Sequence, residues 1–341
     1  MADKNFRILS VDGGGLRGLV PALLLLDLEE RLEAKSGERR PLSDYFHLFA
    51  GTSTGGLISL GLTARDPEQP DRPSMNAEEL VALYRERAAA IFPPRFRLLR
   101  LLRSMVMPKF SNKGLRKAVD EEIGDYLLST ALRDVVVTAY DMTAHEPRYL
   151  KRWRAREPGQ LDPTMADAAM ATSSAPTYLP PWPLGGDALV DGGVFAANPT
   201  MAAIAEALDR KRDPPAPVGL DDLFVVSLGT GYFRAKYTPR RLRAWGALAW
   251  VQPRGSEPAL MRAMLDGQTV STNHFAEVLL NTDPRRPRYY RIEAELGDDV
   301  EMDDARRKTR EKLEKQAAEL VDERGADLEA IAQRLYEAGP I

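Results

Sequence analysis

Short apolar runs and longer amphipathic stretches alternate along this chain, and the alternation predicts strands and helices in turn. The run Phe6 to Val11 predicts a buried strand, and it leads into a helical pattern at Leu19 to Lys35. A second strand is predicted at Phe46 to Ala50 and a second helix at Thr54 to Ala64. Further strands are predicted at 134–141, 148–153, 188–190, 223–227 and 289–292, and further helices at 77–90, 163–171, 199–208, 258–280 and 304–337.

This order of elements favours an α/β fold, because strands that alternate with helices usually build a parallel sheet. We therefore expect a mostly parallel central sheet covered by helices on both faces. The chain of 341 residues shows no internal repeat and no low-complexity linker. Its two proline-rich pieces, 178–183 and 213–217, are short enough to be loops. A single domain over residues 1–341 is the simplest prediction.

Two glycine-rich turns follow the first two predicted strands. The second turn, Gly51-Thr52-Ser53-Thr54-Gly55, fits the pattern G-x-S-x-G, in which a serine sits on a sharp bend between a strand and a helix. Only glycine-sized neighbours let the backbone fold so tightly and leave the hydroxyl exposed. The first turn, Asp12 to Gly18, can supply backbone N–H groups at a helix N-terminus to a developing oxyanion. Together the two turns predict an acyl-transfer site.

Two other interpretations of these turns remain open. Gly13-x-Gly15-x-x-Gly18 also satisfies the dinucleotide-binding fingerprint, since it follows a strand and precedes a helix. That interpretation requires an acidic residue at the end of the second strand, where this chain has the serine turn instead. Ser53 is also compatible with a purely structural role as a small residue in a tight turn.

A serine nucleophile needs a positioned proton acceptor, and the chain has only three histidines. His47 lies on the strand that leads to Ser53 and is too close in sequence to fold back over the hydroxyl, while His145 lies in a predicted hairpin turn. His274 has the chain order of an α/β-hydrolase triad but falls inside a long helical pattern. The remaining candidate is Asp191, where a strand ends in two glycines that let the backbone approach another turn closely.

The chain resembles the patatin-like phospholipases, a family of lipid acyl hydrolases that use a Ser-Asp dyad without histidine. The resemblance rests on motifs that occur in the family's order, namely Asp12-Gly13-Gly14-Gly15-Leu16-Arg17-Gly18, Gly51-Thr52-Ser53-Thr54-Gly55, Ala175-Pro176-Thr177-Tyr178-Leu179-Pro180-Pro181, Asp191-Gly192-Gly193, Ser227-Leu228-Gly229-Thr230-Gly231, Tyr290-Arg291-Ile292 and Met302-Asp303-Asp304-Ala305. It extends over almost the whole chain and implies a three-layer fold.

The resemblance also implies a role for each motif. Ser53 is expected to be the nucleophile and Asp191 the general base. The expected oxyanion and substrate-binding residues are Gly13, Gly14, Gly15, Arg17, Gly18 and Thr54, and the glycines expected to support the two turns are Gly51, Gly55, Gly192 and Gly193. No metal and no organic cofactor are implied, because the dyad and the glycine loop suffice for hydrolysis.

A basic and apolar segment at Phe92 to Lys113 matches no motif of the family that we can name. Between Ala88 and Val119 the chain has eight basic residues and no acidic one, interleaved with phenylalanine, leucine and methionine. Such a segment suits an anionic lipid surface, so we expect a lid or membrane-contact insertion at 92–113. The alternative is a charged helix that packs its leucines on the core. The stretch 234–250 also combines basic with large apolar residues, namely Arg240, Arg241, Arg243, Trp245 and Trp250. It suits either a rim of the protein at a membrane interface or a folded surface loop.

Composition excludes several classes of partner, metal site and membrane segment. The net charge of −3 argues against a general nucleic-acid-binding protein, and the absence of cysteine excludes disulfides and thiolate zinc sites. The N-terminus shows no apolar secretory segment, and the longest apolar run is too short to span a bilayer. The acidic cluster 298–304 lacks the glycine and the spaced ligands of an EF-hand. We expect a cytoplasmic protein that is peripheral at the membrane.

The sequence therefore predicts a phospholipase A type of lipid acyl hydrolase that forms an acyl-enzyme on Ser53. Its expected partners are a phospholipid or another acyl-ester lipid, a transient membrane surface, and either a second copy of the chain or an activating ligand. One alternative is a signalling or antiviral-defence effector whose hydrolase is silent until a ligand or partner binds. A non-enzymatic lipid-binding module is a third interpretation, which the matched motifs around Ser53 and Asp191 disfavour.

Overall fold

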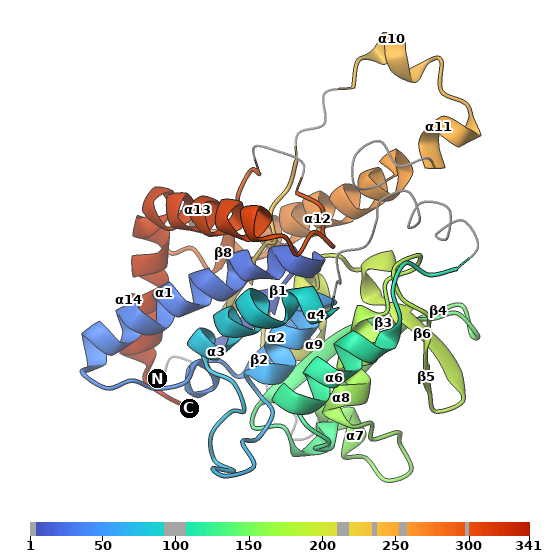
Figure 1. Cartoon of the computed structure of the whole chain (residues 1–341). Coiled ribbons are helices and arrows are strands. Elements are labelled where there is room, and N and C mark those ends of the chain that lie inside the picture. Colours follow the sequence, from blue (N-terminus) through green and yellow to red (C-terminus); the bar gives the residue numbers. More distant parts are fainter. Residues whose placement is uncertain (1–4, 92–106, 210–217, 234–236, 252–257, 297–299) are drawn as a thin grey trace.

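A single eight-stranded sheet forms the centre of the protein, as seen in the computed structural model of residues 5–91, 107–209, 218–233, 237–251, 258–296 and 300–341 (Figure 1). The strand order is β5-β6-β3-β2-β1-β7-β8, and β4 pairs with β3. The strands are β1 (Phe6–Val11), β2 (Leu48–Thr52), β3 (Asp134–Asp141), β4 (Glu146–Lys151), β5 (Trp182–Leu184), β6 (Asp187–Asp191), β7 (Leu223–Leu228) and β8 (Tyr289–Ile292). Strands β1, β2, β3, β7 and β8 run parallel, whereas β4, β5 and β6 pair antiparallel with their neighbours.

Helices cover both faces of this sheet (Figure 1). The longer helices are α1 (Leu19–Ser36), α2 (Thr54–Gly61), α6 (Asn112–Glu122), α8 (Met165–Ser173), α9 (Thr200–Leu208), α12 (Ala259–Leu280), α13 (Arg307–Glu323) and α14 (Gly325–Ala338). The shorter ones are α3 (Ala77–Ala82), α4 (Ala88–Ile91), α7 (Arg152–Ala155), α10 (Pro239–Leu242) and α11 (Ala247–Val251). A π-helical turn at Leu83–Arg87 joins α3 to α4.

The alternation of side chains along the central strands divides the core between the two faces. Leu9 and Val11 of β1 pack into the larger core beneath α1, α2 and α8, while Ile8 points to the smaller core beneath α9 and α12. A strand that buries both faces needs apolar residues at successive positions, and all six residues of β1 are buried. The predicted three-layer α/β fold with a mostly parallel sheet is confirmed.

Several predicted boundaries differ from the structure. The strand expected at 148–153 ends at Lys151, and Trp153 instead belongs to α7, where its ring is buried. The helix expected at 77–90 contains the π-helical turn, and the one expected at 304–337 divides at Arg324 into α13 and α14. The short edge strand β5 and the helix α6 were not predicted. Of the basic segment 92–113, residues 92–106 lie outside the described part of the chain.

Candidate active site

Ser53 occupies a strained turn between β2 and α2. Its backbone angles are φ 55° and ψ −122°, a conformation that a residue with a side chain rarely adopts. Thr172 Oγ1 accepts a 3.0 Å hydrogen bond from the Ser53 N–H. A β-carbon at Gly51 would overlap the Gly55 carbonyl, and one at Gly55 would overlap the Val11 carbonyl. The glycines are therefore required by the close approach of β1, β2 and the first turn of α2.

Asp191 ends strand β6, and its carboxylate lies close enough to the Ser53 side chain for that side chain to lower its pKa. Gly193 N–H donates a hydrogen bond of 2.7 Å to Asp191 Oδ1. Burial raises the pKa of Asp191 to about 6, and the Ser53 side chain and the hydrogen bond from Gly193 act in the opposite direction. At neutral pH the group is therefore mostly a carboxylate that lies against the serine hydroxyl.

The register of β3 explains how Ser53 and Asp191 meet. Thr52, at the end of β2, pairs with Thr138 of β3, and Asp191, at the end of β6, pairs with the next residue, Ala139. Strand β4 occupies the opposite edge of β3 from Val136 to Asp141. Strands β2 and β6 consequently share one edge of β3 and run toward each other, so their C-terminal residues face each other.

The glycine loop between β1 and α1 lies beside this pair of residues. A β-carbon at Gly13 would lie 3.3 Å from Ser53 Cβ, which shows how closely the two turns approach each other. The Gly13 N–H already donates to the Ala197 carbonyl at 3.0 Å. Within the described part of the chain, the N–H groups of Gly14 and Gly15 have no protein acceptor. Both residues line the cavity that contains Ser53.

Three hydrogen bonds, from Thr230 and Arg17, fix the orientation of these peptide groups. Thr230 Oγ1 donates a 2.6 Å hydrogen bond to the Gly13 carbonyl oxygen, and Arg17 donates from its N–H and from Nε to the Gly14 carbonyl oxygen at 3.2 and 3.4 Å. In a trans peptide the carbonyl and the following N–H point in opposite directions. Holding the Gly13 and Gly14 carbonyls therefore also fixes the directions of the Gly14 and Gly15 N–H groups.

The other predicted loop residues form the walls around the turn. The Arg17 guanidinium is buried and lies 5.5 Å from the centre of the Phe233 ring. The Thr54 hydroxyl is hydrogen-bonded to the hydroxyl of Tyr84, and a β-carbon at Gly18 would overlap both side chains. Gly192 packs against Thr138 in the same way. A β-carbon at Gly193 would have more room, with Asp191 Oδ1 nearest to it at 3.2 Å.

A cavity of about 750 Å³ opens at Ser53 and Asp191. Its wall is largely apolar and includes Leu57, Tyr84, Ala88, Leu115, Leu260 and Met264. These residues come from α2, the π-helical turn, α4, α6 and α12. An apolar cavity of this size with few polar groups at one point suits a ligand with a long hydrocarbon chain and one reactive polar bond.

Sequence comparison agrees with these features. The sequence model described as patatin-like phospholipase matches residues 9–204. Patatin-like protein 2 of Arabidopsis thaliana is 37% identical in an alignment 274 positions long that covers 74% of this chain and 67% of that protein. Patatin-like protein 1 of the same organism is 32% identical in an alignment 340 positions long that covers 93% of this chain and 81% of that protein. The chain belongs to the patatin-like phospholipase family.

Two further matches are to a potato protein and to a solved bacterial structure. Patatin-3-Kuras 1 of Solanum tuberosum, whose name marks it as inactive, is 32% identical and covers 72% of this chain and 68% of its own length. Membership of the family places this chain among serine hydrolases. The solved structure of VipD from Legionella pneumophila aligns with 94% of this chain and 67% of its own at 14% identity and a TM-score of 0.40.

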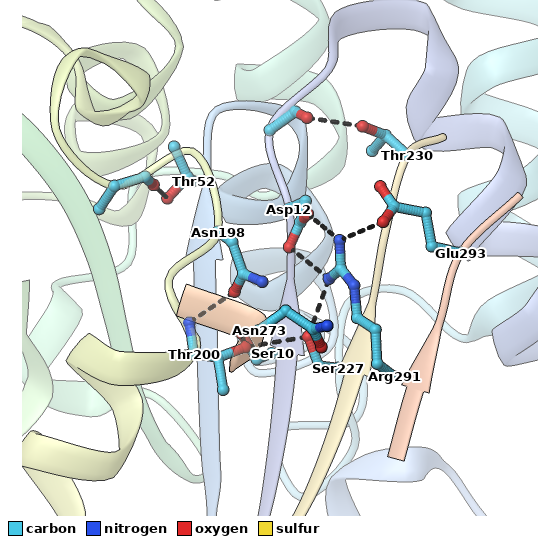
Figure 2. A network of polar contacts seen from close by, with 12 residues as sticks. Ser10, Asp12, Thr52, Asn198, Thr200, Ser227, Thr230, Asn273, Arg291 and Glu293 are labelled. Carbon is cyan, nitrogen blue, oxygen red and sulfur yellow. Dashed lines mark hydrogen bonds and ion pairs between the residues drawn. The ribbon is translucent and has the colours of Figure 1, made fainter. Parts of the chain in front are cut away.

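Beneath the glycine loop of this patatin-like chain lies a buried ion pair that motif analysis did not assign a role (Figure 2). Arg291 of β8 donates to both carboxylate oxygens of Asp12, at 2.9 and 2.6 Å, and also to Ser227 Oγ at 2.9 Å. Glu293 lies 3.0 Å from the same guanidinium. Asp12 immediately precedes the glycine loop, so the pair joins the start of the loop to the far edge of the sheet.

Burial and the opposite charges shift the pKa values of both members of this ion pair. Burial disfavours the charged guanidinium of Arg291, but the carboxylates of Asp12 and Glu293 outweigh burial and raise its pKa. Burial raises the pKa of Asp12 to about 6, while Arg291 acts to lower it. Arg291 appears in the sequence only as one residue of a short matched motif. Its partner 279 residues away could not be identified from spacing.

The three histidines lie elsewhere in the patatin-like fold. His47 Nδ1 accepts a hydrogen bond from the Arg7 N–H, and the imidazole ring of His47 stacks on the ring of Phe6. His145 has φ 56° in the turn between β3 and β4, and His274 lies on α12 beside Phe275. None of the three is among the described residues that line the cavity. Within the described ranges, no group of three or more carboxylate or histidine side chains is placed to hold a metal ion.

Proposed function

We propose that this chain hydrolyses fatty acyl esters of glycerophospholipids through Ser53 and Asp191. The observation that supports the proposal is that the Ser53 side chain and the buried Asp191 carboxylate lie together at the wall of a largely apolar cavity. A serine hydroxyl becomes an effective nucleophile only when a base is positioned to take its proton. A carboxylate with a pKa of about 6 is ionised at neutral pH and is basic enough for that task.

In the proposed first half-reaction, Ser53 Oγ attacks the acyl carbonyl carbon while Asp191 accepts the serine proton. The carbonyl oxygen becomes an oxyanion, and we assign its stabilisation to the N–H groups of Gly14 and Gly15, because the Gly13 N–H is already bonded to Ala197. Thr54 is the residue that follows the nucleophile, and we assign its backbone N–H as the third donor to the oxyanion. The intermediate then collapses, and the proton on Asp191 passes to the departing glycerol oxygen.

Water completes the cycle in the second half-reaction. Asp191 takes a proton from a water molecule that attacks the acyl-serine, and the resulting tetrahedral oxyanion again lies against the glycine N–H groups. Collapse returns the proton to Ser53 Oγ and releases the fatty acid. The mechanism requires only groups of this chain and water, and it uses no metal and no organic cofactor.

The substrate class follows from the cavity wall. Apolar side chains of α2, α4, α6 and α12 favour a hydrocarbon chain over a polar acyl group. Among the described residues no helix is long and apolar enough to cross a membrane. We propose that the enzyme meets its phospholipid at a membrane surface, where the acyl chains that suit this cavity are held, and, given the net charge of −3, that nucleic acid is not a partner.

Covalent labelling with hydrolysis assays tests this proposal. A long-chain fluorophosphonate should form one adduct, on Ser53, and mass spectrometry of the peptides should locate it. Ser53→Ala and Asp191→Ala should both lose phospholipid hydrolysis, while His274→Ala should keep most of it. Labelling that persists in Ser53→Ala, or an inactive and folded His274→Ala, would contradict the proposed dyad. Activity of the purified protein without additives distinguishes a constitutive enzyme from a ligand-gated effector.

A further inference from the structure

Residues 237–251 form an arm that extends away from the body of the protein and carries helices α10 and α11 (Figure 1). The arm contains three exposed arginines, Arg240, Arg241 and Arg243, and no acidic residue. Its aromatic side chains form a cluster, in which Trp245 lies 5.1 Å from Tyr237 and 5.2 Å from Trp250, ring centre to ring centre. The arm therefore combines positive charge with indole and phenol rings on a projecting element.

The apolar side chains of the arm continue into the cavity. Leu248 is 71% exposed and Val251 51% exposed, and on the neighbouring first turns of α12 Leu260 is 44% and Met264 54% exposed. Val251, Leu260 and Met264 also line the cavity that contains Ser53. Exposed apolar side chains that continue into a binding cavity indicate an interaction surface rather than scattered surface residues.

We propose that the arm (237–251) and the first turns of α12 (259–264) are the surface by which the protein docks on an anionic phospholipid bilayer, with the cavity mouth turned toward the lipid. The inference rests on the proposed function and adds the place and chemistry of the contact. Tryptophan and tyrosine favour the boundary between headgroups and acyl chains, and each arginine near the surface gains energy from anionic headgroups. An acyl chain could then enter between Val251, Leu260 and Met264 without crossing water.

Charge distribution favours a bilayer over a second copy of the chain as the occupant of this surface. In a two-fold contact through the arm the same patch meets itself, so the arginines of both copies would lie near each other and repel. The acidic residues of α12 begin beyond the proposed surface, at Asp266 and Glu277. All the charged side chains of the proposed surface are therefore basic, namely Arg240, Arg241, Arg243 and Arg262, and anionic headgroups would be their matching partner.

Vesicle binding by Ser53→Ala tests the surface without interference from hydrolysis. The vesicles would be phosphatidylcholine alone or phosphatidylcholine with about one third phosphatidylglycerol, at low ionic strength. Neutralising Arg240, Arg241 and Arg243 to glutamine should weaken binding to the anionic vesicles by about 10- to 100-fold. Leu248→Ser should weaken it by roughly tenfold. The matched control neutralises Arg285, Arg307 and Lys315, whose side chains are 89%, 85% and 78% exposed, and should bind like Ser53→Ala alone.

Lipids brominated in their acyl chains give a second and local measurement. The chain has four tryptophans, of which Trp153 is buried in the body of the protein. Docking through the arm should quench the emission of Trp245 and Trp250, and Trp250→Phe should lose part of that quenching. Equal vesicle affinity for the arginine variant and its matched control would overturn the proposal. A dimer that Leu248→Ser dissociates, with unchanged vesicle affinity, would assign the surface to a second copy instead.

Turnover of a small soluble ester, measured with Ser53 intact, separates this inference from the proposed function. The arginine variant should hydrolyse the soluble ester like the parent and lose activity only on anionic vesicles. A parent protein that binds vesicles through the arm but hydrolyses neither substrate would contradict the proposed function and leave the docking surface supported. An equal loss on both substrates in the arginine variant would contradict the docking surface.

Discussion

Thr230 Oγ1 donates a 2.6 Å hydrogen bond to the carbonyl oxygen of Gly13, and its side chain fills the space where a β-carbon of residue 14 would lie. The bond holds the peptide that joins Gly13 to Gly14, and with it the direction of the Gly14 N–H. Thr230 is buried and lies 217 residues from Gly13 in the sequence. It is therefore a candidate positioning residue for the proposed oxyanion donors.

Thr230→Val should lower kcat by about 10- to 100-fold with little change in KM, because a misdirected donor affects the oxyanion more than the bound ester. Thr230→Ser keeps the hydroxyl and should retain most of the rate. Steady-state kinetics on a soluble ester measure both variants, and thermal melting verifies their folding. If serine restores nothing, the hydroxyl of Thr230 has no part in positioning the loop.

Asp191 should make activity depend on pH. The carboxylate must be ionised to accept the Ser53 proton, and burial raises its pKa to about 6. We therefore expect kcat/KM to fall tenfold per pH unit below about pH 6 and to be nearly constant just above pH 7. A pH profile on an ester without ionisable groups tests this, and an acid limb near pH 4 would show that Asp191 titrates like an exposed carboxylate.

The same raised pKa predicts a gain in stability when the charge at Asp191 is removed. The folded protein binds the Asp191 proton more tightly than the unfolded chain, so this group makes the fold less stable as pH rises from about 4 to about 6. Asp191→Asn should increase the free energy of unfolding at pH 7 by up to about 3 kcal/mol while abolishing hydrolysis. The gain should vanish below about pH 4, where both states of the parent are protonated. Denaturant titrations at the two pH values measure the difference, and an equal effect at both would exclude a contribution from the charge.

Removing one member of the Asp12–Arg291 pair should destabilise the fold strongly. Arg291→Met leaves two carboxylates, Asp12 and Glu293, close together in a buried site, and the expected loss in the free energy of unfolding is about 3 to 5 kcal/mol. The double variant Asp12→Asn with Arg291→Met should lose less than the sum of the single variants, because it leaves fewer unpaired charges. Chemical denaturation gives all the values, and strict additivity would show that the pair does not act as a unit.

The cavity wall at α4 should limit the length of the acyl chain that the enzyme accepts. Ala88 is buried and lines the cavity, whereas Ala89 is exposed and is not among the lining residues. Ala88→Phe should reduce hydrolysis of long-chain esters relative to short-chain ones, at a loss of about 1 to 3 kcal/mol of stability from overpacking. Ala89→Phe is the matched control and should leave the chain-length preference unchanged. Competition between short and long esters provides the ratio, and equal ratios for both variants would exclude α4 from the acyl site.

Local sequence determined the elements and the two turns, because those features depend on neighbours in the chain. The G-x-S-x-G pattern predicts a bend at Ser53, and the structure has φ 55° there with no room for β-carbons at Gly51 and Gly55. The parallel core strands were predicted because both of their faces are apolar. The one-domain organisation and the lid at 92–113 stay predictions.

Tertiary structure alone decided which groups face each other across the site. Asp191 meets Ser53 because β2 and β6 share an edge of β3, a register that no local pattern contains. Likewise, only the fold shows that the Gly13 N–H donates its hydrogen bond to the Ala197 carbonyl. The Gly14 and Gly15 N–H groups are therefore the ones that we assign to the oxyanion. Periodicity encodes which side of an element is buried, but contacts between residues more than 100 positions apart depend on strand order and register. These in turn depend on the packing of the whole core.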